Sequence, residues 1–109
     1  MTTRALSIRS PYAGEIIAGA KRIENRSWLP PEGIGRIAVH RCGAGGAIIG
    51  TIEVAEVITW EEALERYPEQ DDYIAGPWCW VLRDPRPCEP IPCKGRLNLW
   101  HLPEGIVLD

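Results

Sequence analysis

The residues best able to do chemistry lie close together near the start of the chain. Lys21, Glu24 and Arg26 fall within six positions, shortly after Gly19 and an amphipathic stretch at 11–18. A glycine at that place favours the end of a helix, because a residue without a Cβ adopts the left-handed conformation at low cost. The charged side chains are therefore expected to leave a helix end on an extended segment. A cation and a carboxylate held on such a turn can bind a polar planar ligand or move its protons.

Alternation along the segment 22–28 should place the side chains at 24, 26 and 28 on one face and those at 23 and 25 on the other. Lys21 and Glu24 form either a catalytic pair or a surface salt bridge, which would add little stability. Arg26 either holds a ligand carbonyl or phosphate in its planar fork or fixes Glu24 by a bidentate pair. Trp28 and Trp78 either stack on a base or pack in the core.

The rest of the pattern predicts a small α+β protein. Helices are expected near 11–18 and 60–66, the second with Thr59 as its N-cap and Glu62 three residues on, as in a capping box. The proline-rich stretch 85–92 should be a loop or a sheet edge, because proline cannot donate to a β-ladder. The glycine-rich residues 42–46 match no phosphate-binding pattern and fit a surface loop. Strands are expected at 4–9, 22–28, 34–40, 47–58, 78–83 and 94–101, and residues 1–109 are interpreted as a single domain with one core.

Ordered motifs in this chain resemble those of the ASCH family, a branch of the PUA-like superfamily. The first match is the segment Leu6-Ser7-Ile8-Arg9-Ser10-Pro11-Tyr12, and the second is the ordered set Gly19, Lys21, Glu24, Arg26 and Trp28. Segments at 35–40, 50–54, 76–82 and 94–100 are also similar, so the resemblance covers nearly the whole chain. It implies a small mixed β-barrel of about six strands with two or more short helices.

The resemblance also implies an activity. Some compact members of the family hydrolyse N4-acetylcytidine to cytidine and acetate, using the motif lysine, a threonine three residues later and a distal acid. Lys21 matches that lysine, whereas Glu24 occupies the threonine position. Glu24 would act instead as general base on water, with Lys21 stabilising the charge on the amide oxygen. Asp71 is the expected distal acid and Glu69 the next choice. Substrate-binding roles are expected for Ser7, Tyr12, Arg26, Trp28 and Trp78, a nucleoside is the expected substrate, and no metal or cofactor is expected.

A non-catalytic module that binds RNA or a modified base is the alternative, because PUA-like domains commonly do this. Lys21, Arg22 and Arg26 would then contact phosphate, while a tryptophan stacks on a base. The net charge of −3 and the acidic residues at 61–72 favour a nucleoside-sized ligand over long RNA. The family also includes nucleases, a reading that no metal-binding carboxylate motif supports here. The oligomeric state does not follow from the sequence.

The cysteines and the length of the apolar runs indicate the cellular compartment of the protein. Cys42, Cys79, Cys88 and Cys93 occur without a secretory signal and are expected to be free thiols, and their spacing does not fit a zinc deaminase. His40, at the end of an apolar strand, is expected to be structural. No apolar run approaches the ~20 residues that span a bilayer. A cytoplasmic location without membrane contact is therefore expected.

Overall fold

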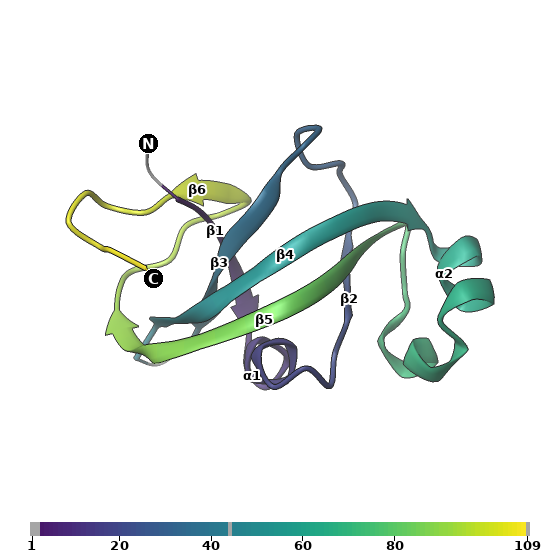
Figure 1. Cartoon of the computed structure of the whole chain (residues 1–109), viewed down its shortest axis with the longest axis horizontal. Coiled ribbons are helices and arrows are strands. Elements are labelled where there is room, and N and C mark those ends of the chain that lie inside the picture. The colour runs from purple at the N-terminus through teal and green to yellow at the C-terminus, as the bar shows by residue number, and fades with distance from the viewer. Residues whose placement is uncertain (1–2, 44, 109) are drawn as a thin grey trace.

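The computed structural model describes residues 3–43 and 45–108, and its main feature is one curled six-stranded sheet (Figure 1). The strand order is β2-β5-β4-β3-β1-β6, and β1 pairs with β3 in parallel whereas the other neighbours are antiparallel. The order leaves β2 and β6 as edges, so the sheet forms an open half-barrel. This confirms the expected α+β, PUA-like fold. The strands are β1 (Arg4–Arg9), β2 (Ile23–Arg26), β3 (Gly35–Cys42), β4 (Ala47–Thr59), β5 (Trp78–Pro92) and β6 (Leu99–His101).

Helix α1 (Tyr12–Ile17) lies against the curled sheet and ends as the glycine predicted. Gly19 has φ of +87°. Its N–H donates to the Ile16 carbonyl at 3.1 Å, and the N–H of Ala20 donates to the Glu15 carbonyl at 3.0 Å. These two bonds form a Schellman cap, which satisfies carbonyls that a helix end leaves free. The cap turns the chain so that Lys21 begins the run into β2.

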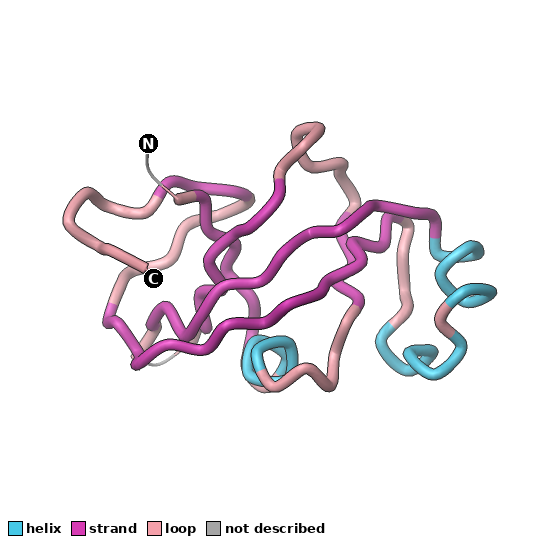
Figure 2. The backbone as a smooth tube through the Cα atoms, in the orientation of Figure 1, coloured by secondary structure: helices cyan, strands magenta, loops and turns pink. Residues whose placement is uncertain are grey.

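Helix α2 (Trp60–Arg66) begins at the predicted cap, because the Thr59 hydroxyl accepts from the Glu62 N–H at 3.3 Å. A further 3₁₀ helix, η1 (Pro68–Tyr73), follows directly and was not predicted. Proline ends α2 but fits the first turn of a new helix, since its missing N–H is not needed there. Figure 2 shows α2 and η1 together at one end of the long sheet, beside the loop that leads into β5.

The longest strand is β5 with 15 residues, two more than β4. Its second half is the proline-rich stretch that was expected to be a loop or an edge. Residues 83–92 pair with β4 on one side, whereas β2 pairs with β5 only at 78–81. This half is therefore an edge, where proline needs no ladder partner on its outer side. Bulges at Ile48/Gly50, Thr51/Glu53 and Val54/Glu56 increase the twist of the β4–β5 pair.

Both faces of the sheet are covered, because alternate side chains enter different apolar clusters. In β1, β3 and β5 one set of alternate residues, which includes Leu6, Val39 and Trp80, packs in the main core with Ala13 and Ile16 of α1. Ala5 and Ala38 face the opposite side, where Trp100 and the segment after β6 cover them. Ile23, Cys79 and Val81 form a third cluster with Ala63 of α2. Trp80 and Trp100 are thus core residues, as predicted.

Residues 94–98 differ from the expectation of a strand over 94–101, because β6 begins at Leu99. The preceding residues instead cross over the buried side chain of His40, and the N–H of Cys93 bonds the Gly46 carbonyl at 3.1 Å. The loop 42–46 joins β3 to β4, and its residue 44 lies outside the described residues. Within the described ranges no helix has the length and apolar character needed to cross a membrane.

Candidate functional site

A cavity of about 420 Å³ opens between α1, β2 and η1 and contains most of the predicted site residues. Its size suits a small organic ligand, since such sites usually measure about 300–1,000 Å³. Three chain segments meet at it: the end of β1 with the start of α1, the segment 21–26, and the end of η1 with the loop after it. The lining residues are Ser7, Ile8, Arg9, Tyr12, Lys21, Glu24, Asn25, Arg26, Asp72, Tyr73 and Ala75.

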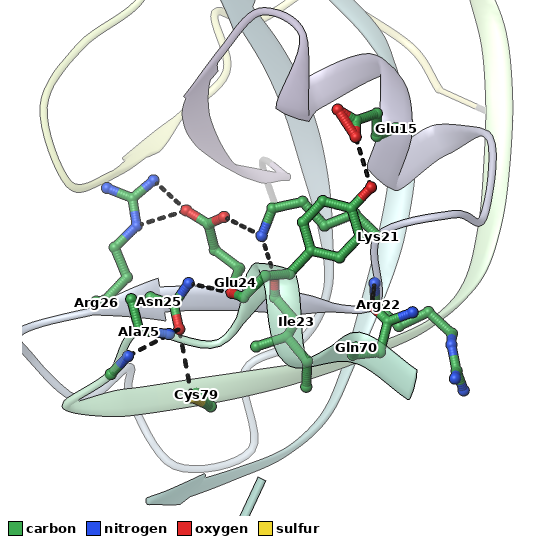
Figure 3. Close-up of polar contacts among 12 residues, drawn as sticks. Glu15, Lys21, Arg22, Ile23, Glu24, Asn25, Arg26, Gln70, Ala75 and Cys79 are labelled. Atoms are coloured by element: carbon green, nitrogen blue, oxygen red, sulfur yellow. Dashed lines mark hydrogen bonds and ion pairs between the residues drawn. The ribbon is translucent and has the colours of Figure 1, made fainter. Parts of the chain in front are cut away.

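Lys21 is buried, with 4% of its surface exposed, and it therefore does not form a surface salt bridge. Its Nζ lies 3.5 Å from Oε1 of Glu24 and also donates to the carbonyl of Ile23 (Figure 3). The rings of Tyr12 and Tyr73 stand 5.8 and 5.3 Å from the ammonium. Burial lowers the pKa of Lys21 below its ordinary value of 10.5, and the nearby carboxylates of Glu24 and Glu15 offset this only in part.

Glu24 is also buried, at 8% exposure, and stands between two cations. Its Oε2 accepts from Nε of Arg26 at 3.0 Å and lies 2.8 Å from a terminal guanidinium nitrogen, while Oε1 faces Lys21. The same guanidinium donates to the Ser7 carbonyl at 3.1 Å, which ties it to β1. Of the two roles left open for Arg26, the structure shows the one in which it fixes Glu24.

The wall opposite β2 is held by two amide side chains. Asn25 donates to the Tyr73 carbonyl at 2.7 Å and accepts from the N–H groups of Ala75 and Gly76 at 2.9 and 3.0 Å (Figure 3). Gln70, which is buried, accepts from the Arg22 N–H at 2.7 Å and donates to the Ala20 carbonyl at 3.1 Å. Because these bonds satisfy buried polar groups, they fix the distance between η1 and β2.

Tyr73 completes the cavity by connecting η1 to α1. Its hydroxyl donates to Oε2 of Glu15 at 2.6 Å, and this bond raises the pKa of the phenol. The ring thereby covers Lys21 from one side. Tyr12, by contrast, is 44% exposed and stands at the rim.

The structure brings five of the eight predicted site residues to the cavity: Ser7, Tyr12, Lys21, Glu24 and Arg26. Trp28 is not among the lining residues, because its ring packs edge-on against Trp80 with centroids 5.2 Å apart. Trp78 starts β5 opposite Arg26 in the ladder and does not line the cavity either. Trp28 therefore lies at the margin of the core, and the aromatic rings that line the cavity are those of Tyr12 and Tyr73.

Asp71 also lies outside the lining, whereas its neighbour Asp72 is part of it. The difference comes from η1, a helix that was not predicted. One residue along a 3₁₀ helix rotates the side chain by about a third of a turn. Arg9, Asn25, Asp72 and Tyr73 were all missed as lining residues. Asn25 could have been found, because it stands inside the charged motif, but nothing in the sequence marked Tyr73.

The arrangement can do two kinds of chemistry. A buried lysine next to a carboxylate can polarise a ligand carbonyl, and the carboxylate can accept a proton from water. The same polar groups can instead hold a planar base without reaction. The described residues contain no group of three or more His, Cys, Asp or Glu side chains placed to hold a metal ion.

Comparison with known proteins assigns the fold that carries this cavity. The model of the ASCH domain matches residues 6–92. The chain belongs to the ASCH domain family. That match includes most of β1, all of β2 to β5 and every residue that lines the cavity.

Relatives of this ASCH chain are distant in sequence. Human activating signal cointegrator 1 is 22% identical over 131 residues, which cover 93% of this chain and 22% of the human protein. The chain thus spans about a fifth of the length of that relative. The crystal structure of ASCH from Zymomonas mobilis is similar with a TM-score of 0.74 and 20% identity, covering 94% of this chain and 89% of that one. A tyrosine-to-phenylalanine variant of the same bacterial protein gives a TM-score of 0.72 at 20% identity, with 95% and 92% covered. At such identity the likeness shows the fold.

Proposed function

We propose that this ASCH protein hydrolyses the amide of N4-acetylcytidine or a related N4-acylated cytidine. The observation that carries the proposal is the buried pair of Lys21 and Glu24 at a cavity of about 420 Å³. A nucleoside fits a cavity of this size. Burying two charges costs free energy that a merely structural pair would seldom recover, which favours a chemical role for both.

In the proposed reaction Glu24 takes a proton from a water molecule, and the water oxygen attacks the acyl carbon. The ammonium of Lys21 stabilises the negative charge that develops on the amide oxygen. The bond between the acyl carbon and N4 then breaks, and N4 receives a proton, which leaves cytidine and the carboxylic acid. Arg26 positions Glu24 for this role, since it holds one carboxylate oxygen in place.

Asp72 replaces Asp71 in this proposal as the distal acid. Asp72 lines the cavity, and it stands beside Tyr73, whose ring faces Lys21. A carboxylate at this rim can carry the proton that N4 receives. The neighbouring Asp71 provides a matched control, because it has the same side chain, one residue away, outside the cavity.

The test is incubation of purified protein with N4-acetylcytidine, with cytidine measured by chromatography. Lys21→Ala and Glu24→Gln should each lower turnover by at least ~100-fold, the usual scale for losing such a group. Asp72→Asn should lower turnover strongly, whereas Asp71→Asn should leave it near the wild-type value. Glu24→Thr restores the residue type of the amidohydrolases that the sequence resembles, and activity in this variant would show that the site tolerates either chemistry. Near wild-type turnover in a folded Lys21→Ala protein would rule out the mechanism.

The alternative is a module that binds RNA or a modified base without turnover. An unpaired cation favours it: Arg9 lines the cavity and has no ion-pair partner in the part of the chain that the structure describes. Tight binding of unmodified RNA that weakens steeply with salt, with no hydrolysis of any acylated nucleoside, would select this function instead.

A further inference from the structure

A second cavity of about 510 Å³ adjoins the first one. Ser7 and Arg26 line both cavities, so the two spaces meet at these side chains. The remaining walls come from the end of β3, the loop after it and the segment 93–98. The cleft of this protein therefore extends well beyond the volume around Lys21 and Glu24.

Positive charge without a partner gathers at the second cavity. Its described lining contains no aspartate or glutamate, and of its cations Arg26 is paired with Glu24 whereas Lys94 and Arg96 are unpaired. Lys94 and Arg96 are exposed, and neither side chain has a hydrogen bond or ion pair within residues 3–43 and 45–108. Because the whole chain carries a net charge of −3, this local excess of cations is opposite to the overall balance. It is suited to an anionic group of a ligand.

The segment 93–98, which carries Lys94 and Arg96, is held in place by buried groups. Nε2 of His40 lies 2.6 Å from the carbonyl of Cys93, and the N–H of Cys93 donates to Gly46 at 3.1 Å. Since a carbonyl can only accept, Nε2 carries the proton. Gly95 lies so close that a Cβ there would stand 2.6 Å from Cε1 of His40 and 2.7 Å from Oγ of Ser7. His40 thus anchors this segment through Nε2, and it holds the two flanking cations at the cavity.

We propose that this second cavity is a phosphate subsite, so that the cleft takes a phosphorylated nucleoside. The inference rests on the proposed function, because it assumes that the base lies beside Lys21 and Glu24. In a nucleotide the phosphate is one ribose away from the base, which matches two adjoining cavities joined at Ser7 and Arg26. Arg96 binds phosphate oxygens through its planar fork and Lys94 as a point charge.

The same phosphate ester chemistry is found in a mononucleotide and in an RNA strand. The experiment therefore compares cytidine, cytidine 5′-monophosphate, cytidine 3′-monophosphate and a short oligocytidylate by calorimetric titration at one fixed salt concentration. The cavity variant is Lys94→Gln with Arg96→Gln. A matched variant, Arg66→Gln with Arg86→Gln, removes the same charge from exposed residues that line neither cavity.

A monophosphate should bind the wild-type protein at least ~10-fold more tightly than cytidine, a difference of about 1.4 kcal/mol. The cavity variant should lose this advantage and keep its affinity for cytidine, while the matched variant should keep both. If the oligocytidylate binds more tightly than either monophosphate, an RNA strand is the source of the phosphate. If the oligocytidylate and a monophosphate bind with equal affinity, the source is a mononucleotide.

Equal affinity for cytidine and both monophosphates would overturn the inference, and so would an advantage that survives in the cavity variant. No measurable binding of any of these compounds would overturn it as well. Hydrolysis of N4-acetylcytidine without a phosphate advantage would leave the proposed reaction standing and remove the subsite. A phosphate advantage that depends on Lys94 and Arg96, without hydrolysis, would support the subsite and contradict the proposed reaction.

Discussion

At the scale of single residues, the central feature is the environment of Lys21. Its ammonium is withdrawn from water between two tyrosine rings and retains two carboxylates as neighbours, Glu24 and Glu15. Burial dominates, so the pKa of Lys21 lies below 10.5. The Glu24 carboxylate forms an ion pair with this ammonium and is held in turn by an ion pair with Arg26. A substitution at any of these three positions therefore affects the other two, and their energetic effects should not be additive.

The lowered pKa of Lys21 predicts a pH limit for the proposed reaction. The lysine must be protonated to stabilise the developing oxyanion, so turnover should fall as the pH rises through its lowered pKa, below 10.5. The folded protein binds fewer protons than the unfolded chain between that pKa and 10.5. Lys21 therefore makes the free energy of unfolding increase with pH in this window, and loss of activity there is not unfolding caused by this group.

This pH profile is measured as turnover against pH, with circular dichroism at each point. Lys21→Arg is the matched variant, because arginine stays protonated throughout the range. Its relative profile should lack the alkaline fall even if its absolute turnover is low. An unchanged alkaline limb in this variant would show that another group titrates.

At the scale of elements, the ends of short helices position the residues of the site. The Schellman cap of α1 directs Lys21 into the cavity. The hydrogen bonds of Gln70 tie η1 to the residues on either side of Lys21, and those of Asn25 tie the end of η1 and the loop after it to β2. None of these helices exceeds seven residues, so their positions depend on capping and tertiary bonds more than on helix propensity.

Two glycines of the α1 region test this dependence. Gly19→Ala should destabilise the protein by about 1 kcal/mol, because Gly19 has φ of +87° and alanine is disfavoured in that conformation. Gly14→Ala should instead stabilise it by roughly 0.5–1 kcal/mol, because Gly14 is helical and a Cβ there meets nothing within 4 Å. Urea denaturation of both variants measures the difference. Equal effects of the two substitutions would contradict the role given to the cap.

At the scale of the whole molecule, one curled sheet is buried on both faces along much of its length. The main core lies between the sheet and α1, while the segment after β6 and the pair α2–η1 cover parts of the other face. Trp80 is fully buried in the main core and is the largest of the fully buried side chains that the structure describes. Since the chain contains no phenylalanine, tryptophan supplies much of the large apolar volume.

Trp80→Ala should therefore lower the free energy of unfolding by about 3–5 kcal/mol, the usual cost of removing a large buried aromatic side chain. Val107→Ala is the comparison, since Val107 is 79% exposed and its truncation should change stability by less than about 0.5 kcal/mol. Thermal and urea unfolding measure both variants. A small effect at Trp80 would mean that the core can close around the missing ring.

The sequence by itself determined the features that depend on neighbours along the chain. Gly19 as a helix end, Thr59 as a cap, the extended run after Lys21 and the edge position of the prolines all follow from local backbone preferences. The charged motif also identified three residues of the cavity, Lys21, Glu24 and Arg26, because alternation along β2 and the end of α1 place them together. Local chemistry was enough for each of these.

The tertiary structure alone decided which side chains face the cavity from elsewhere. Asp72 rather than Asp71, the ring of Tyr73 over Lys21, and the packing of Trp28 on Trp80 depend on where η1 and the sheet lie in space. The burial of Lys21 and Glu24 depends on it as well, and so does the position of Lys94 and Arg96 beside Ser7 and Arg26. Tyr73 is 52 residues from Lys21 in the sequence, and Arg96 is 70 residues from Arg26. Only the folding of the sheet brings them together, since no local pattern specifies contacts over such distances.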